Sequence, residues 1–284
     1  MSTSQLMDVL EKQFVPDALV VDNLQKLAVK NKILLQFLTN LKIGGSLRVE
    51  QEKRFNLTVQ AAGVLSGYLA DFNYAFFKFV KPVMYVPADI DLLVSLEDSY
   101  GVVKKLESGG YRVVVEEPYC VTLVKDAVIV DVYVHPTIGG VVYLDGALLL
   151  KHVRSVEFNG LNIPALTSYA EALVVAAHAV YKEKLYTLND YFTIKNWITP
   201  KSRQLAKELN CEKALDLILN LNAKIQHQQL NMPYSFPTPF WLTLLFQKAC
   251  NDNLTRSTCP KFLQALADKR SGLQIASKLT RETY

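Results

Sequence analysis

Two aspartates, Asp89 and Asp91, lie in the run Pro87-Ala-Asp-Ile-Asp-Leu-Leu-Val94. Side chains two residues apart on a strand point to the same face, so the two carboxylates would share one face while Ile90 takes the other. Two carboxylates that close repel each other unless a cation lies between them, and hard divalent ions prefer oxygen ligands. The run therefore predicts a metal site.

Asp131 supplies a third carboxylate, because it interrupts the apolar run Val128-Ile-Val-Asp-Val-Tyr-Val134. An ionised carboxylate is costly to bury in an apolar strand. If this strand lies beside the first, the three carboxylates converge and would hold Mg²⁺ or Mn²⁺. The alternative is that Asp89 is a turn residue at a strand entrance and that Asp131 faces solvent at a sheet edge.

Five features around these aspartates, in the order in which they occur, resemble the nucleotidyltransferase superfamily, which includes DNA polymerase beta and small prokaryotic nucleotidyltransferase-like proteins. They are a short strand with a lysine, the Asp-x-Asp strand, a helix ending in Gly-Tyr, a strand with a further Asp, and a helical tail. Here these features are Phe76-Phe-Lys-Phe-Val80, residues 87–94, Ser108-Gly-Gly-Tyr111, Val130-Asp-Val132 and the helices from Leu166 onward.

The resemblance implies a magnesium-dependent nucleotidyltransferase that moves NMP from an NTP to a hydroxyl on an RNA end, a protein side chain or a small molecule. Asp89, Asp91 and Asp131 would be the catalytic residues and the metal ligands. One departure is that the family usually carries a Gly-Ser pair shortly before Asp-x-Asp, where this sequence reads Phe77-Lys-Phe79. That departure favours the alternative of a catalytically inactive member that binds nucleotides or a protein.

Two lysines and a polar pair are candidates for binding the nucleotide or its phosphates. Lys78 lies between two phenylalanines and could hold a phosphate as a point charge, or it could be an outward strand lysine. Lys81 follows it closely. His178 and Lys182 are one helical turn apart, and in the resembling family a polar pair on this helix faces the cleft; the alternative places His178 in the core. His135, at the end of the Asp131 strand, is either an acid or base or simply exposed.

The composition is that of a soluble globular protein. The 284 residues are half apolar and one-fifth charged, with a net charge of +4 that permits a phosphate-bearing partner without requiring one. No run of about 20 apolar residues is present, so we expect no membrane span. The polar start lacks a basic, apolar signal design, which favours a cytoplasmic location.

Hydrophobic periodicity predicts an α+β protein with a mixed, nucleotidyltransferase-type sheet and helices on one of its faces. We expect two domains, an α/β domain with N-terminal helices over 1–165 and a helical domain over 166–284. The expected helices are 5–40, 50–71, one from Asp98 or Ser99 to 107, one from 167 to 186, and further helices after Pro200. The expected strands are 74–80, 88–94, 111–116, 119–125, 128–134 and a hairpin-like pair within 153–164.

Overall fold

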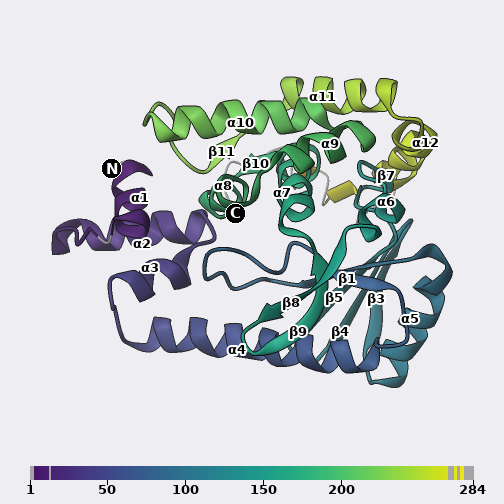
Figure 1. Ribbon diagram of the computed structural model, residues 1–284, viewed down its shortest axis with the longest axis horizontal. Coiled ribbons are helices and arrows are strands. Elements are labelled where there is room, and N and C mark those ends of the chain that lie inside the picture. Colours follow the sequence, from purple (N-terminus) through teal and green to yellow (C-terminus); the bar gives the residue numbers. More distant parts are fainter. Residues whose placement is uncertain (1–2, 13, 268–271, 274–275, 278–284) are drawn as a thin grey trace.

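The computed structural model describes residues 3–12, 14–267, 272–273 and 276–277, and its architecture is α+β around a mixed seven-stranded sheet (Figure 1). The strand order is β3-β4-β5-β2-β1-β9-β8. The strands of this sheet are β1 (Tyr74–Phe76), β2 (Ile90–Val94), β3 (Arg112–Glu117), β4 (Cys120–Lys125), β5 (Val128–Tyr133), β8 (Val153–Phe158) and β9 (Leu161–Leu166). Two small sheets pair β6 (Thr137–Ile138) with β7 (Val141–Val142) and β10 (Leu185–Tyr186) with β11 (Tyr234–Ser235).

Helices pack against both faces of the sheet, so the expectation of helices on one face is wrong. The described α-helices are α1 (Thr3–Glu11), α2 (Ala18–Lys30), α3 (Leu34–Asn40), α4 (Ser46–Tyr68), α5 (Leu96–Ser108), α6 (Gly146–Leu150), α7 (Ser168–Ala177), α8 (Leu188–Trp197), α9 (Pro200–Glu208), α10 (Glu212–Gln226), α11 (Thr238–Asn251) and α12 (Asn253–Ala267). In Figure 1, α4 lies along the lower edge of the sheet, and α10 and α11 lie on the opposite side of the molecule with α7 between. None of the described helices has the length and apolar content needed to cross a membrane.

The two central strands, β2 and β5, are parallel neighbours, which confirms the predicted adjacency of the two aspartate-bearing strands. Their register places Asp91 opposite Asp131. β1 and β9 are also parallel, and the remaining neighbours in the sheet are antiparallel. Parallel strands in register present opposed residues on the same sheet face, so these two carboxylates lie on one side.

Each face of β2 belongs to a different hydrophobic cluster. Ile90, Leu92 and Val94 are buried with residues of α4 and α5, as the alternation along the strand predicts. Leu93 is buried in the other cluster, together with Tyr133 and many residues of the C-terminal helices. Asp91 shares the face of Leu93, so its carboxylate points toward the C-terminal helices rather than toward α4 and α5.

The single helix predicted over 5–40 is wrong, because the chain forms α1, α2 and α3 instead. The break after α2 contains Asn31, which is fully buried, and Lys32, whose backbone is left-handed at φ 56°. The Asn31 amide donates to the Met232 carbonyl at 3.2 Å and accepts from the Leu188 N–H at 3.0 Å. Contacts with residues far along the chain therefore stop the helix, and no local pattern announces them.

The N-terminal helices pack against the C-terminal part of the chain. Buried residues of α1, α2 and α3 belong to the same hydrophobic cluster as residues of α7, α8 and α10. The Met232 N–H donates to Thr3 Oγ1 at 2.7 Å, and Lys195 pairs with Glu11 at 2.6 Å. The division into domains at residue 165 stays a prediction. These contacts connect the segment before residue 165 to the segment after it.

Three predicted boundaries differ in the structure. The strand predicted over 74–80 ends at Phe76, because the backbone turns at Lys78, where φ is 57°. α5 begins at Leu96, since the Ser95 side chain caps it by accepting from the Asp98 N–H. The helix predicted to reach Tyr186 is α-helical only as far as Ala177 and then continues as a π-helix, His178–Glu183.

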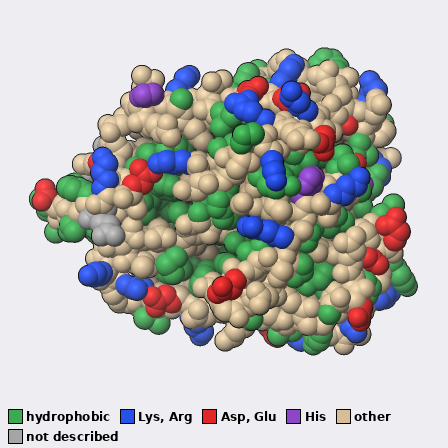
Figure 2. Space-filling model, viewed as in Figure 1, with side chains coloured by type: hydrophobic (Ala, Val, Ile, Leu, Met, Phe, Trp, Pro, Cys, Tyr) green, Lys and Arg blue, Asp and Glu red, His purple; other side chains and the backbone are tan. Residues whose placement is uncertain are grey.

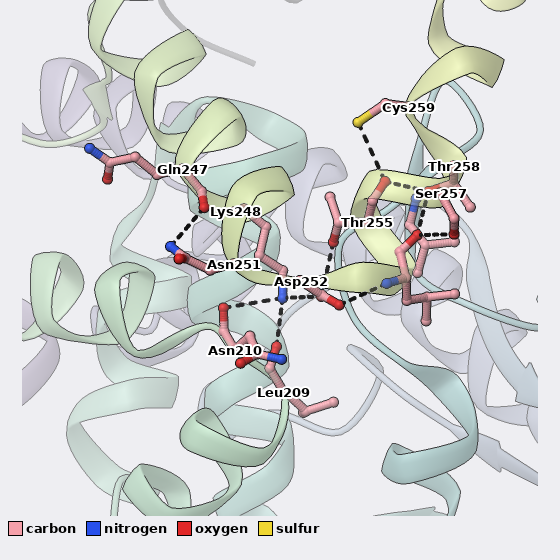
Figure 3. Close-up of polar contacts among 12 residues, drawn as sticks. Leu209, Asn210, Gln247, Lys248, Asn251, Asp252, Thr255, Ser257, Thr258 and Cys259 are labelled. Carbon is pink, nitrogen blue, oxygen red and sulfur yellow. Dashed lines mark hydrogen bonds and ion pairs between the residues drawn. The ribbon is translucent and has the colours of Figure 1, made fainter.

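A buried lysine fixes the packing of the last helices, as Figure 3 shows. Lys248 of α11 donates from Nζ to the carbonyls of Leu209 and Asn210, at 2.6 and 3.2 Å, just beyond the end of α9. The same Nζ lies 2.6 Å from Asp252 Oδ2. A cation at a helix C-terminus satisfies carbonyls that the helix leaves unpaired, so Lys248 connects α9 to α11.

Candidate metal centre

Three carboxylates meet on the face of β2 and β5 that is turned toward the C-terminal helices. One ligand oxygen from each of Asp89, Asp91 and Asp131 lies within 4.8 Å of the others. Asp91 is buried and the other two are half-buried. Asp89 precedes β2 and lies two residues before Asp91, while Asp131 is opposite Asp91 on β5. The three aspartates therefore lie close enough to bind one metal ion.

The state of Asp91 shows that a divalent ion fits these residues. Its Oδ1 is buried and lies 2.9 Å from Lys78 Nζ, so an ion pair compensates part of its charge. One ammonium faces three neighbouring carboxylates, and a hard divalent cation with oxygen ligands would compensate their charge more fully. The all-carboxylate set suits Mg²⁺ and Mn²⁺ alike.

Burial, the largest effect, raises the pKa of Asp91 to about 7. Lys78 opposes this increase, and the charges of Asp89 and Asp131 add to it. Burial also opposes the charge on Lys78, but Asp91, Tyr143 and Asp89 together outweigh it and raise the pKa of that ammonium. Lys78 is therefore a permanent cation at neutral pH, whereas Asp91 takes up a proton near neutrality.

The affinity of the site for Mn²⁺ is expected to increase with pH up to about 7 and to level off above it, because the ion binds the ionised form of Asp91. In the metal-free protein, the contribution of Asp91 to folding stability changes with pH in the opposite direction. A raised folded-state pKa contributes stability below the unfolded pKa of 3.8, and that contribution is lost as pH rises through 7. Calorimetric Mn²⁺ titrations between about pH 5.5 and 8.5 measure the predicted change in metal affinity. Asp126→Asn, at an exposed hairpin turn, should reproduce the wild-type profile, and a flat profile would contradict the assignment of Asp91.

Hydrogen bonds orient the carboxylate of Asp131. Thr122, its partner in the register of β4 and β5, donates to Oδ1 at 2.6 Å. The Tyr133 hydroxyl donates to Oδ2 at 3.3 Å and accepts from Lys182 Nζ at 2.8 Å. Partners of this kind fix the direction of a metal-binding carboxylate and tune its basicity.

Lys78 lies beside the aspartates, although the structure places it in a turn rather than in the predicted strand. Its N–H donates to Glu171 Oε2 at 2.9 Å, and its Nζ pairs with Asp91. The rings of Phe77 and Tyr133 lie 4.9 and 5.3 Å from the same nitrogen. The left-handed turn therefore aims this lysine into the site.

Lys81 is held by Glu171 and does not contact the aspartates. The distance from Nζ to Oε1 is 2.9 Å, and the side chains of Lys81 and Glu171 are only 6% and 4% exposed. Since the other Glu171 oxygen binds the backbone of Lys78, one buried carboxylate fixes the whole turn after β1. The sequence shows Glu171 only as an acidic residue in the first turn of a helix, so its role was missed.

These residues line a pocket of about 340 Å³. Lys78, Lys81, Asp89 and Asp91 lie on the side of the sheet, and the helical side is formed by Val175, His178, Lys182 and Glu183. This confirms the expectation that the first helix of the tail faces the carboxylates across a cleft. Figure 2 shows acidic and basic side chains interspersed over the viewed face of the molecule rather than gathered into one large basic area.

The π-helical turn shapes the helical wall of the pocket. The Tyr143 hydroxyl lies 3.1 Å from His178 Nδ1, and Glu183 lies 3.6 Å from Nε2. His178 and Glu183 are five residues apart, the spacing of one π-helical turn, and such turns occur frequently at functional sites. His135 lies elsewhere, where its Nδ1 accepts from the Gly146 N–H and burial lowers its pKa, so its role is structural.

Several pocket residues were not predicted as site residues. They are Lys32, Tyr85, Ala88, Val175, Glu183, Asn189 and Asp190. Asp190 caps α8 through a reciprocal pair with Thr187, and the sequence Thr-x-x-Asp is the one local signal that marks this helix start. Lys32 comes from the turn after α2, and burial, opposed by Glu183 and Asp190, lowers its pKa. Only long-range packing brings Lys32 to the site.

No protein-family model matches the chain, and no curated protein is detectably similar to it. The assignment of a function therefore depends on the chemistry and geometry of the pocket.

Proposed function

We propose that the protein is a magnesium- or manganese-dependent nucleotidyltransferase with a sheet of the nucleotidyltransferase type. It would transfer NMP from an NTP to the hydroxyl of an RNA end, a protein side chain or a small molecule, with release of pyrophosphate. The observation that carries this proposal is the convergence of three carboxylates within 4.8 Å of one another. Two of them, Asp89 and Asp91, line a pocket that also contains lysines.

The pocket supports a ligand of nucleotide size and charge. Its volume, about 340 Å³, lies at the lower end of the range for small-molecule sites. Four lysines line it. Lys78 Nζ pairs with Asp91, and Lys182 Nζ is connected to Asp131 through the Tyr133 hydroxyl. Ammonium groups stabilise phosphate oxygens as point charges, so these two are the proposed phosphate contacts. His178 is proposed to lie along the nucleotide and Lys81 to position the turn.

In the proposed reaction the acceptor oxygen forms a bond to the α-phosphorus, and the bond from that phosphorus to pyrophosphate breaks. A bound divalent ion would supply charge neutralisation at phosphorus and a lower pKa for the acceptor hydroxyl. Asp89 and Asp91 would hold it. Asp131, oriented by Thr122, would complete the ligand set or accept the hydroxyl proton. Lys78 and Lys182 would stabilise negative charge on the phosphates.

A second candidate is a protein that binds nucleotides without transferring them. It is favoured by the sequence Phe77-Lys-Phe79, which provides neither glycine nor hydroxyl at the turn after β1. Both candidates require nucleotide binding, and only the first requires turnover.

Wild-type protein is expected to melt at a higher temperature with Mg²⁺ or Mn²⁺, and higher still with NTP, because ligands that bind the folded state stabilise it by mass action. At about one hundred times the dissociation constant the gain is about 2.7 kcal/mol. Asp89→Asn should lose the metal-linked gain, while Asp126→Asn, which is exposed and outside the pocket, should retain it. Differential scanning calorimetry measures both.

Turnover then separates the two candidates. Transfer of label from α-labelled NTP to RNA, protein or small hydroxyl acceptors, with release of unlabelled pyrophosphate, would support the transferase. A metal- and nucleotide-linked gain in stability without turnover would support the binding protein. If neither metal nor NTP changes the melting temperature, the proposed function is wrong in both forms.

A further inference from the structure

We propose that the side chain of Lys78 is a tethered cation that competes with the divalent ion for Asp91 and is released to the phosphates of the ligand when the ion binds. This inference depends on the proposed metal-dependent function and concerns the control of that same site.

Lys78 already occupies part of the space in which the ion would bind. Its Nζ lies 2.9 Å from Asp91 Oδ1, and the two side chains are only 12% and 9% exposed. The same carboxylate supplies one of the three oxygens that lie within 4.8 Å of one another. An ion among those oxygens would lie within a few ångströms of the ammonium, where two cations in a poorly solvated site repel strongly. The ion and the ammonium therefore exclude each other at Asp91.

The backbone of Lys78 is fixed, so the exchange needs only side-chain rotation. Its N–H is held by Glu171 Oε2 at 2.9 Å, and Glu171 is itself buried against Lys81. Four rotatable bonds separate this anchored backbone from the ammonium. The rings of Phe77 and Tyr133 lie close to Nζ. Aromatic faces attract cations, so these rings stabilise the ammonium during its displacement.

The pocket gives the displaced ammonium a destination. Lys78 lines it together with Lys182 and His178, and phosphate oxygens bound there would replace the carboxylate as its partner. An ion that displaces the lysine then favours phosphate binding, and a phosphate that captures the lysine favours the ion. By linkage the two effects are equal, so the metal and the phosphate-bearing ligand bind with positive cooperativity.

Lys81 provides a matched control. It lines the same pocket, it is similarly buried, and its ammonium pairs with Glu171 rather than with an aspartate of the metal centre. Loss of a lysine charge from the pocket is therefore common to Lys78→Met and Lys81→Met, whereas the release of Asp91 is specific to the first. Methionine preserves the unbranched shape of the side chain without its charge.

Calorimetric titration with Mn²⁺ alone, at about pH 8.5 where protons compete least, tests the inference. We expect Lys78→Met to bind Mn²⁺ about tenfold more tightly than wild type. Lys81→Met is made together with Glu171→Gln, so that no charge stays buried without its partner and an acceptor remains for the Lys78 N–H, and this double variant should match wild type. Equal affinities of Lys78→Met and wild type would overturn the tethered-cation role and leave the proposed function intact. If no variant binds Mn²⁺ with or without NTP, the metal centre itself is wrong and both proposals fail.

A measurement on the wild-type chain removes any dependence on how the variants fold. Brief acetylation followed by mass spectrometry reports the reactivity of each lysine. Mn²⁺ should increase the acetylation of Lys78 relative to Lys81, because the ion takes its carboxylate partner. An unchanged ratio in protein that calorimetry shows to be metal-bound would overturn the inference.

Discussion

Replacing Asp131 with asparagine is expected to slow nucleotidyl transfer about a thousandfold or more, which corresponds to about 4 kcal/mol of lost transition-state stabilisation. Asparagine has nearly the same shape and can still accept the hydrogen bond from Thr122, which lies 2.6 Å away. It lacks the negative charge that a metal ligand or a general base requires. Single-turnover release of pyrophosphate at saturating NTP and metal measures the effect.

Tyr133→Phe is the matched control for that experiment. It removes the hydroxyl that connects Lys182 to Asp131 but leaves the carboxylate in place. Loss of such a supporting contact costs about ten- to a hundredfold in metal affinity or activity, so the tyrosine variant should be less impaired than Asp131→Asn. If Asp131→Asn keeps at least a tenth of wild-type activity, Asp131 is neither ligand nor base in the reaction.

Replacing Glu171 with alanine is expected to reduce the free energy of unfolding by about 3 to 5 kcal/mol. Lys81 would keep its charge in a site where its side chain is 6% exposed, without the carboxylate that compensates it. The N–H of Lys78 would also lose its acceptor. Denaturation with urea, followed by fluorescence, measures the change.

A double-mutant cycle tests whether the buried charge is the cause. Lys81→Met in the Glu171→Ala background should recover part of the stability, because the uncompensated charge is gone. Asp216→Asn, in the pair with Arg203 whose side chains are both 59% exposed, should change stability by no more than about 0.5 kcal/mol. A Glu171→Ala loss of less than about 1 kcal/mol would mean that water reaches and solvates Lys81.

The closeness of Asp89 and Asp91 was predictable because it depends on a local rule. Alternation along a strand places Asp89 and Asp91 on one face, and Ile90 on the other, whatever the rest of the fold. The approach of Asp131 needed one further step, the pairing of β5 with β2, which the sequence left as a condition because a strand at the sheet edge was the alternative. The α+β class followed from the same periodicities.

The rest of the pocket depends on contacts between residues far apart in the chain. Glu171 binds Lys81 across 90 positions, and the buried Asn31 ends α2 through partners near residues 188 and 232. A local pattern has no access to such pairs, so Lys32 and the break after α2 were missed. The break before α2 does have a local signal, Pro16, which the prediction of one helix overlooked. The turn at Lys78 was read as strand because its neighbours are aromatic, and aromatic residues are common in strands.

The shared core of the N-terminal and C-terminal helices has a consequence for the order of folding during synthesis. α1 to α3 are made before the sheet, but their apolar partners on α8 and α10 are made after it. The sheet with α4 and α5 has a hydrophobic cluster of its own and can form before the N-terminal helices have packed. Lys32 and Asn189 both line the pocket but lie 157 positions apart in the sequence, so they meet only when that late association occurs. A ribosome-bound chain that ends before α8 would therefore carry the three aspartates without an assembled pocket.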